Sequence, residues 1–101
     1  MTTTAATKEE AEGVARALVD GRLAACVQIV GPMESRYWWD GAVETATEWV
    51  CVAKTTADRY DEVEAAIRAV HSYDVPEILA VPVVRGSEAY VRWLGQETAR
   101  R

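Results

Sequence analysis

A short stretch late in the chain holds four side chains that can take part in acid–base or metal chemistry. Residues 71–77 read His-Ser-Tyr-Asp-Val-Pro-Glu and so combine an imidazole, a phenol and two carboxylates. They follow a helical pattern and precede an apolar run, and Pro76 restricts the backbone beside them. We expect these groups to meet in a cleft, where His71 would ligate a metal or contact a ligand. The alternative is a structural role, because a charged histidine is stabilised at a helix C-terminus.

Lys54 is a second candidate binding residue. It ends an apolar strand pattern just before a predicted helix N-terminus, where free amides and the helix dipole favour anions. A lysine there would add a point charge for a carboxylate or a phosphate. The alternative is a strand-end lysine that reaches solvent or pairs with Glu77.

Aromatic residues form the third group of candidates. Tyr37, Trp38 and Trp39 are consecutive, and we expect them to pack in a subunit interface or to form the wall of a ligand pocket. Tyr90 and Trp93 lie at helical spacing and are predicted to face inward, with polar tips that reach the rim of a cleft.

No constellation of an enzyme is visible, and the composition narrows the class of protein further. The sequence lacks a P-loop, a GxSxG motif and a zinc-type Cys/His cluster. Cys26 and Cys51 each lie in an apolar strand pattern, which predicts buried, inert, free thiols. The net charge of -5 and the pI of about 4.8 argue against nucleic-acid binding. Without a signal peptide or a membrane span, a cytoplasmic protein is expected.

Hydrophobic periodicity predicts a single α+β domain over residues 1–101. The Thr7-Lys8-Glu9-Glu10 capping box begins the first helix, because the Thr7 hydroxyl can accept from the Glu10 amide and the Glu10 carboxylate can reach back. A strand bulged at Gly31-Pro32 turns at Asp40-Gly41 and returns as its partner. The expected segments are strands over 1–5, 23–39, 42–54 and 78–84, and helices that begin near 8, 57 and 88. This βαββαβ order with a long central hairpin and a C-terminal helix is ferredoxin-like.

The chain resembles the CutA family of divalent-cation-tolerance proteins. The resemblance rests on Leu23-Ala24-Ala25-Cys26, Tyr37-Trp38-Trp39-Asp40-Gly41, Lys54-Thr55-Thr56, residues 71–77 and Tyr90-Val91-Arg92-Trp93-Leu94. It implies a non-enzymatic homotrimer in which long hairpins pair edge to edge, with Tyr37, Trp38 and Trp39 in the interface. Because the trimer would be similar to that of PII signal proteins, it also implies ligand clefts between subunits. The residues assigned to such a cleft are Lys54, His71, Glu77, Trp38, Tyr90 and Trp93.

The resemblance also bears on metal binding. Copper-binding members have a proposed ligand set of one cysteine in the first strand and two adjacent histidines. These positions correspond here to Thr3, Val70 and His71. A hydroxyl and an isopropyl group do not replace thiolate and imidazole as ligands. The expectation is therefore a weak site for Cu²⁺ or another divalent cation, formed by His71 with Glu77. The alternative function is a signalling module that binds a small anionic ligand or a protein partner in the intersubunit cleft.

Overall fold

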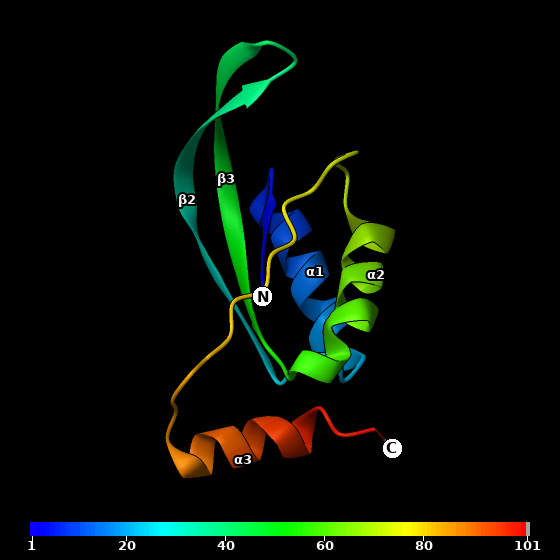
Figure 1. Cartoon of the computed structure of the whole chain (residues 1–101). Coiled ribbons are helices and arrows are strands. Elements are labelled where there is room, and N and C mark those ends of the chain that lie inside the picture. Colours follow the sequence, from blue (N-terminus) through cyan, green and yellow to red (C-terminus); the bar gives the residue numbers. More distant parts are fainter. Residues whose placement is uncertain (101) are drawn as a thin grey trace.

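A computed structural model describes residues 1–100 as a twisted antiparallel sheet with two helices packed beside it (Figure 1). The elements in chain order are β1 (Thr2–Ala5), α1 (Lys8–Asp20), β2 (Cys26–Trp39), β3 (Ala42–Lys54), a 3₁₀ turn η1 (Ala57–Arg59), α2 (Tyr60–Val70) and α3 (Glu88–Glu97). The sheet order is β1-β3-β2. The predicted α+β, ferredoxin-like class is confirmed.

The core lies between the sheet and the two helices. Residues at i, i+3 and i+7 of α1 are buried, as an amphipathic helix requires. The largest fully buried side chains include Leu18, Ile67 of α2 and Cys51 of β3. Full burial of a residue such as Leu18 contributes about 1.5–3 kcal/mol. The core members are Ala5, Ala11, Val14, Leu18, Ala24, Cys51, Ala53, Val63 and Ile67.

The β2–β3 hairpin extends well beyond this core. It runs upward past the helices in Figure 1, and β1 pairs only with residues 49–52 of β3. The predicted bulge is present, since the register shifts between Val30 and Met33. The predicted turn is present too: Asp40 and Gly41 have φ of 50° and 80°, values that suit a type I′ hairpin.

The predicted last strand over residues 78–84 does not form as a strand. Leu79 alone makes an isolated bridge, exchanging two backbone hydrogen bonds with Thr2 at the free edge of β1. The bridge lies where a ferredoxin-like fold has its fourth strand. Because β1 begins at Thr2 and runs antiparallel, residues past 80 extend beyond its end, and Pro82 lacks an N–H. Val81, Val83 and Val84 are therefore strongly exposed, Val84 at 86%.

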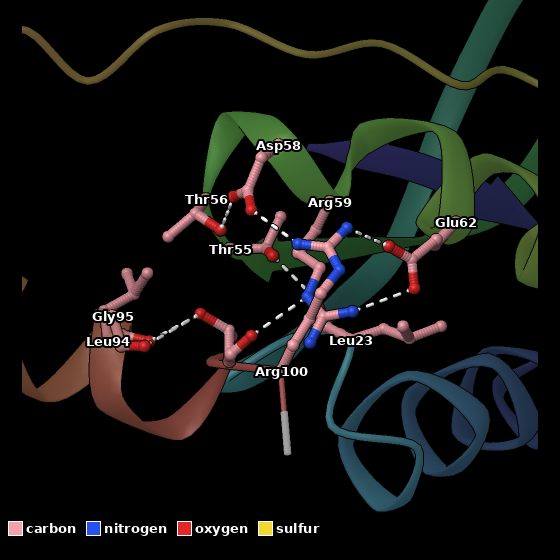
Figure 2. A network of polar contacts seen from close by, with 10 residues as sticks. Leu23, Thr55, Thr56, Asp58, Arg59, Glu62, Leu94, Gly95 and Arg100 are labelled. Carbon is pink, nitrogen blue, oxygen red and sulfur yellow. Dashed lines mark hydrogen bonds and ion pairs between the residues drawn. The ribbon is translucent and has the colours of Figure 1, made fainter.

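The terminal helix also departs from the prediction. Tyr90 and Trp93 do not face a core, because α3 buries none of its residues and both rings are more than 40% exposed. The helix is held at its C-terminal end, where buried Arg59 donates from Nε to the Thr98 carbonyl (2.9 Å). Arg100 reaches Asp58 (2.8 Å) in the polar network that Figure 2 shows. These contacts fix α3 while leaving its apolar face uncovered.

None of the helices within residues 1–100 combines the length and the apolar character needed to cross a bilayer.

Thr3 offers a test of the packing around β1. Its side chain is buried opposite Cys51, and its hydroxyl oxygen has no hydrogen-bond partner within the described part of the chain. Since a buried hydroxyl without a partner costs about 1–3 kcal/mol, we expect Thr3→Val to raise the free energy of unfolding by about 1 kcal/mol. Chemical unfolding followed by circular dichroism measures this. Thr2→Val is the matched control and should bring no gain, because the Thr2 hydroxyl already donates to Glu77 (3.1 Å). A less stable Thr3→Val protein would contradict the packing.

Candidate functional site

His71 ends α2, and both of its ring nitrogens are used by the fold. Its side chain is fully buried. Nε2 lies 2.6 Å from the Thr4 carbonyl oxygen, and Nδ1 lies 3.1 Å from the Tyr73 backbone nitrogen. A carbonyl can only accept and a backbone N–H can only donate, so the neutral tautomer with hydrogen on Nε2 satisfies both contacts. In this arrangement neither nitrogen has a free lone pair for a metal.

The carboxylate of Glu10 fixes the start of the 72–77 loop. It accepts from the Ser72 amide (2.9 Å) and the Ser72 hydroxyl (2.8 Å), and it lies 3.5 Å from Nδ1 of His71. Burial alone would raise the pKa of Glu10, but the hydrogen bonds from the Ser72 amide and hydroxyl lower it below its usual range. The Thr7 hydroxyl does accept from the Glu10 amide (3.1 Å), so that half of the predicted capping box is confirmed. The carboxylate, however, bonds to Ser72 and ties α1 to the loop.

Tyr73 connects the same loop to the long hairpin. Its ring centroid lies 4.8 Å from that of His71, and its hydroxyl donates to Oε2 of Glu48 on β3 (3.0 Å). Burial and the Glu48 carboxylate raise the pKa of Tyr73 to about 12. Glu48 is only 8% exposed. A loop side chain is thus anchored to a nearly buried carboxylate on the hairpin.

A groove of about 720 Å³ lies between the outer hairpin and this loop. Side chains alternate along a strand, so Tyr37 and Trp39 of β2 share one face with Glu44, the direct partner of Tyr37. Trp38 pairs with Val43 and points to the other face. The groove is lined by Thr4, Ser35, Arg36, Tyr37, Trp39, Glu44, Glu48, Ser72, Tyr73, Asp74, Val75 and Glu77. Its charged lining is four carboxylates against one guanidinium.

The single chain does not assemble the predicted ligand cleft. Glu77 lines the groove, but Trp38 points away from it and His71 is buried behind it. Lys54 lies at the opposite end of β3 and donates to Gln28 (2.8 Å). Its Nζ lies 6.0 Å from the ring centroid of Tyr90, which is 5.5 Å from that of Trp93. The chain therefore brings Lys54, Tyr90 and Trp93 together, and none of the three lines the groove that Glu77 lines.

His71 and Glu77, the predicted metal ligands, do not share a contact in the structure. The Glu77 carboxylate accepts from the Thr2 hydroxyl, whereas His71 bonds to backbone groups. Within residues 1–100, no three His, Cys, Asp or Glu side chains lie close enough to hold a metal ion. The Thr3 position precedes Thr4, whose carbonyl holds His71, so the positions aligned with the copper ligands do lie near one another in the fold.

The two thiols differ in burial. Cys51 is buried and its Sγ lies 3.5 Å from the Ala11 carbonyl, and burial raises its pKa, as expected for an inert thiol. Cys26 is only half-buried, so full burial was a wrong prediction for that residue. Both are free.

Sequence reasoning identified the two loop carboxylates that line the groove but missed the two on β3. Glu44 and Glu48 are four apart on β3 and so lie on one face of the strand. The signal available was Glu48 itself, a charge placed next to the apolar run 49–53. Its burial depends on Tyr73, which the sequence places 25 residues away.

The chain is similar to proteins named for tolerance of divalent cations. A family model described as CutA1 divalent ion tolerance protein matches residues 1–97. The divalent-cation tolerance protein CutA of Archaeoglobus fulgidus is 41% identical, over 92% of this chain and 90% of that protein. The rice protein CutA 1, chloroplastic, is 40% identical over 90% of this chain and 51% of its own length. The solved divalent cation tolerance protein (Cut A1) from Thermus thermophilus superimposes with a TM-score of 0.95 at 39% identity, covering 97% of this chain and 95% of that one.

Tyr73 provides a direct spectroscopic test of the groove. An ordinary tyrosine ionises near pH 10, so we expect one phenol to stay protonated until about pH 12 in an ultraviolet titration. Tyr73→Phe should remove this component, and Glu48→Gln should move it to lower pH. Because the folded-state pKa is raised, the stability that the neutral phenol contributes is present below about pH 10 and is lost as the pH rises toward 12. Circular dichroism recorded alongside verifies that the protein is still folded. A titration unchanged by Tyr73→Phe would refute the assignment.

Proposed function

The chain belongs to the CutA1 family of divalent ion tolerance proteins, and from this premise we propose that it acts in divalent-cation tolerance as a non-enzymatic homotrimer. The observation that carries the proposal is apolar surface that a monomer leaves in water. Trp38 is 75% exposed, the valines of segment 81–84 are at least as exposed, and the Tyr90 and Trp93 rings face outward.

Unpaired strand edges support the same assembly. Among residues 1–100, no strand pairs with the outer side of β2, and none pairs with residues 42–48 of β3 on the side where β1 stops. Exposed edges of this length promote aggregation unless another chain pairs with them. Hairpins that pair edge to edge between three subunits would satisfy these backbone groups and cover Trp38. Tyr37 and Trp39 belong to the same proposed interface region, although they point to the groove side of the hairpin.

The proposed metal site is weak. His71 would have to give up its bond from the Tyr73 amide or its bond to the Thr4 carbonyl before it could ligate Cu²⁺. Thr3 and Val70 supply no soft donor, and Glu77 is the remaining proposed ligand. Any role in cation tolerance would then depend on the assembly and its partners more than on tight metal storage.

A second candidate is a PII-like module that binds a small anion in a cleft between subunits. The observation that favours it is Lys54, whose ammonium forms no ion pair among the described residues and lies beside the exposed Tyr90 ring. In a single chain the groove that Glu77 lines includes none of the other proposed cleft residues. Neighbouring subunits would have to bring these groups together. Loss of phosphate binding in Lys54→Gln but not in Arg16→Gln would support it.

A cytoplasmic location is part of the same proposal. Two free cysteines, one of them buried, suit a reducing compartment. An enzymatic role is disfavoured because the chain's single histidine is occupied by structural hydrogen bonds on both nitrogens.

The trimer is tested by sedimentation of the purified protein at low micromolar concentration. We expect a single species of three chains. A stable interface buries about 1,200–2,000 Å², and the exposed apolar regions described above would provide that surface. Trp38→Ser should shift the equilibrium toward smaller species. Val70→Ser is the matched control, since Val70 is an exposed valine at the end of α2 and is not among the residues of the proposed interface. A folded monomer in the unmodified protein would refute the assembly.

Copper binding is tested by calorimetric titration. We expect Cu²⁺ to bind weakly, and Thr3→Cys combined with Val70→His to bind it more tightly, because two donors are restored beside His71. Binding should weaken as the pH falls, since protons compete with Cu²⁺ for the imidazole and only the neutral ring coordinates. Tight binding by the unmodified protein that survives His71→Ala would show that the metal site lies elsewhere.

A further inference from the structure

The C-terminal helix α3 packs loosely against the rest of the chain. No residue of α3 is buried, and every residue from Leu79 to Trp93 is exposed. A cavity of about 380 Å³ is lined by Trp93 and Glu97 on one side and by the end of α1 and the turn after it on the other. Figure 1 shows the extended segment that leads from the edge of the sheet to α3. A helix with so little buried surface depends on the polar groups at its end for a fixed position.

Arg59 is the central group of this attachment. Its side chain is more than nine-tenths buried, and Figure 2 shows it between α2 and the end of α3. Nε donates to the carbonyl of Thr98, the residue that ends α3 (2.9 Å), and Nη1 donates to Glu62 of α2 (2.8 Å). The carbonyls at a helix C-terminus carry partial negative charge, so a cation is favoured there. Because a buried charge that loses a partner is strongly destabilising, Arg59 holds the two helices together.

Exposed ion pairs lie on both sides of Arg59. Arg100 contacts Asp58 (2.8 Å) and Glu62 (2.5 Å), and Arg22 contacts Glu97 of α3 (2.5 Å). Exposed ion pairs contribute little to stability, and salt screens them. Their loss should therefore affect the position of α3 less than loss of the buried Arg59 contact.

We propose that Arg59 acts as a latch for subunit assembly. By fixing α3, it holds the exposed rings of Tyr90 and Trp93 in the position from which they meet a neighbouring subunit. This inference rests on the homotrimer proposed above and names the residue that controls its formation. With Arg59 bonded to Thr98, α3 enters the interface already ordered, and a pre-organised surface loses less conformational entropy on association. Without that bond, each subunit would have to order α3 on binding, which weakens association.

Hydrogen exchange of α3 and sedimentation of the purified full chain together test the latch. In Arg59→Gln we expect the backbone amides of α3 to exchange about tenfold faster. We also expect the subunit dissociation constant to rise by at least about tenfold, as loss of a contact of about 1.4 kcal/mol would do. Circular dichroism verifies that the core helices and the sheet are intact.

Two further variants separate the latch from a general effect of charge. Arg92→Gln is the matched control: it removes an exposed arginine whose ion pair with Glu88 (2.5 Å) lies within α3, so it should change neither measurement. Arg100→Gln removes exposed contacts between the end of the chain and the α2 region. Its effect should be smaller than that of Arg59→Gln and should fade at high salt. Because Arg100 is exposed, this variant decides the question if Arg59→Gln does not fold.

The outcomes distinguish failure of the latch from failure of the homotrimer. A folded monomer in the unmodified protein would refute the homotrimer, and the latch with it. If the trimer forms and the Arg59 and Arg100 variants match Arg92→Gln in both measurements, the latch alone is wrong and neighbouring subunits hold α3 without it. Faster exchange in α3 with unchanged association would also overturn the inference, because Arg59 would then fix the helix without controlling assembly.

Discussion

A hairpin longer than the helices can cover is the constraint on which the rest of the structure depends. β2 and β3 pair from Cys26 and Lys54 at the base to Trp39 and Ala42 at the tip, whereas the core covers only the lower part. The molecule is elongated as a result, 44 Å against 27 and 21 Å. Three uncovered features follow from this: the free edges of the outer strands, the exposed Trp38, and a groove between the outer hairpin and the 72–77 loop. A shorter hairpin would make a more complete monomer without any of these surfaces.

A small hydrogen-bond network around His71 and Glu10 fixes the position of the 72–77 loop. The buried ring of His71 joins the carbonyl of Thr4 to the amide of Tyr73, and Glu10 satisfies the Ser72 amide beside it. Each group has a partner of the opposite type, as buried polar groups require. The lone histidine therefore acts here as a connector between β1 and the loop. Both ring nitrogens of His71, a residue type suited to catalysis and metal binding, are thus used to position the loop. The chemistry of the groove therefore depends on its carboxylates and aromatic rings.

The sequence predicted correctly those features that depend on residues close to one another in the chain. The apolar spacing of α1, the Thr7 cap, the bulge at Gly31-Pro32 and the Asp40-Gly41 turn all depend on residues close in sequence, and all are present. Segment 78–84 does not form a strand because a strand needs a partner. Leu79 already pairs with Thr2, the first residue of β1, so the residues that follow extend past the start of β1. Tyr90 and Trp93 failed as core residues for a similar reason: periodicity identifies an apolar face but does not identify what covers it. The burial of Glu48 depends on Tyr73 reaching it across 25 residues, a contact that no local pattern contains.

Side chains alternate between the two faces of the outer hairpin, and this places an apolar residue and a group of carboxylates on opposite faces. Tyr37, Trp38 and Trp39 are consecutive, yet Trp38 turns with Val43 to one face while its neighbours turn with Glu44 to the other. Burial of Trp38 in the proposed assembly would therefore use the face that points away from the carboxylates. An apolar interface and a charged groove would conflict on one face, because covering Glu44 and Glu48 without a counter-ion is costly. Because Trp38 and the carboxylates lie on opposite faces, the outer hairpin could bury Trp38 in an assembly without burying Glu44 beside it.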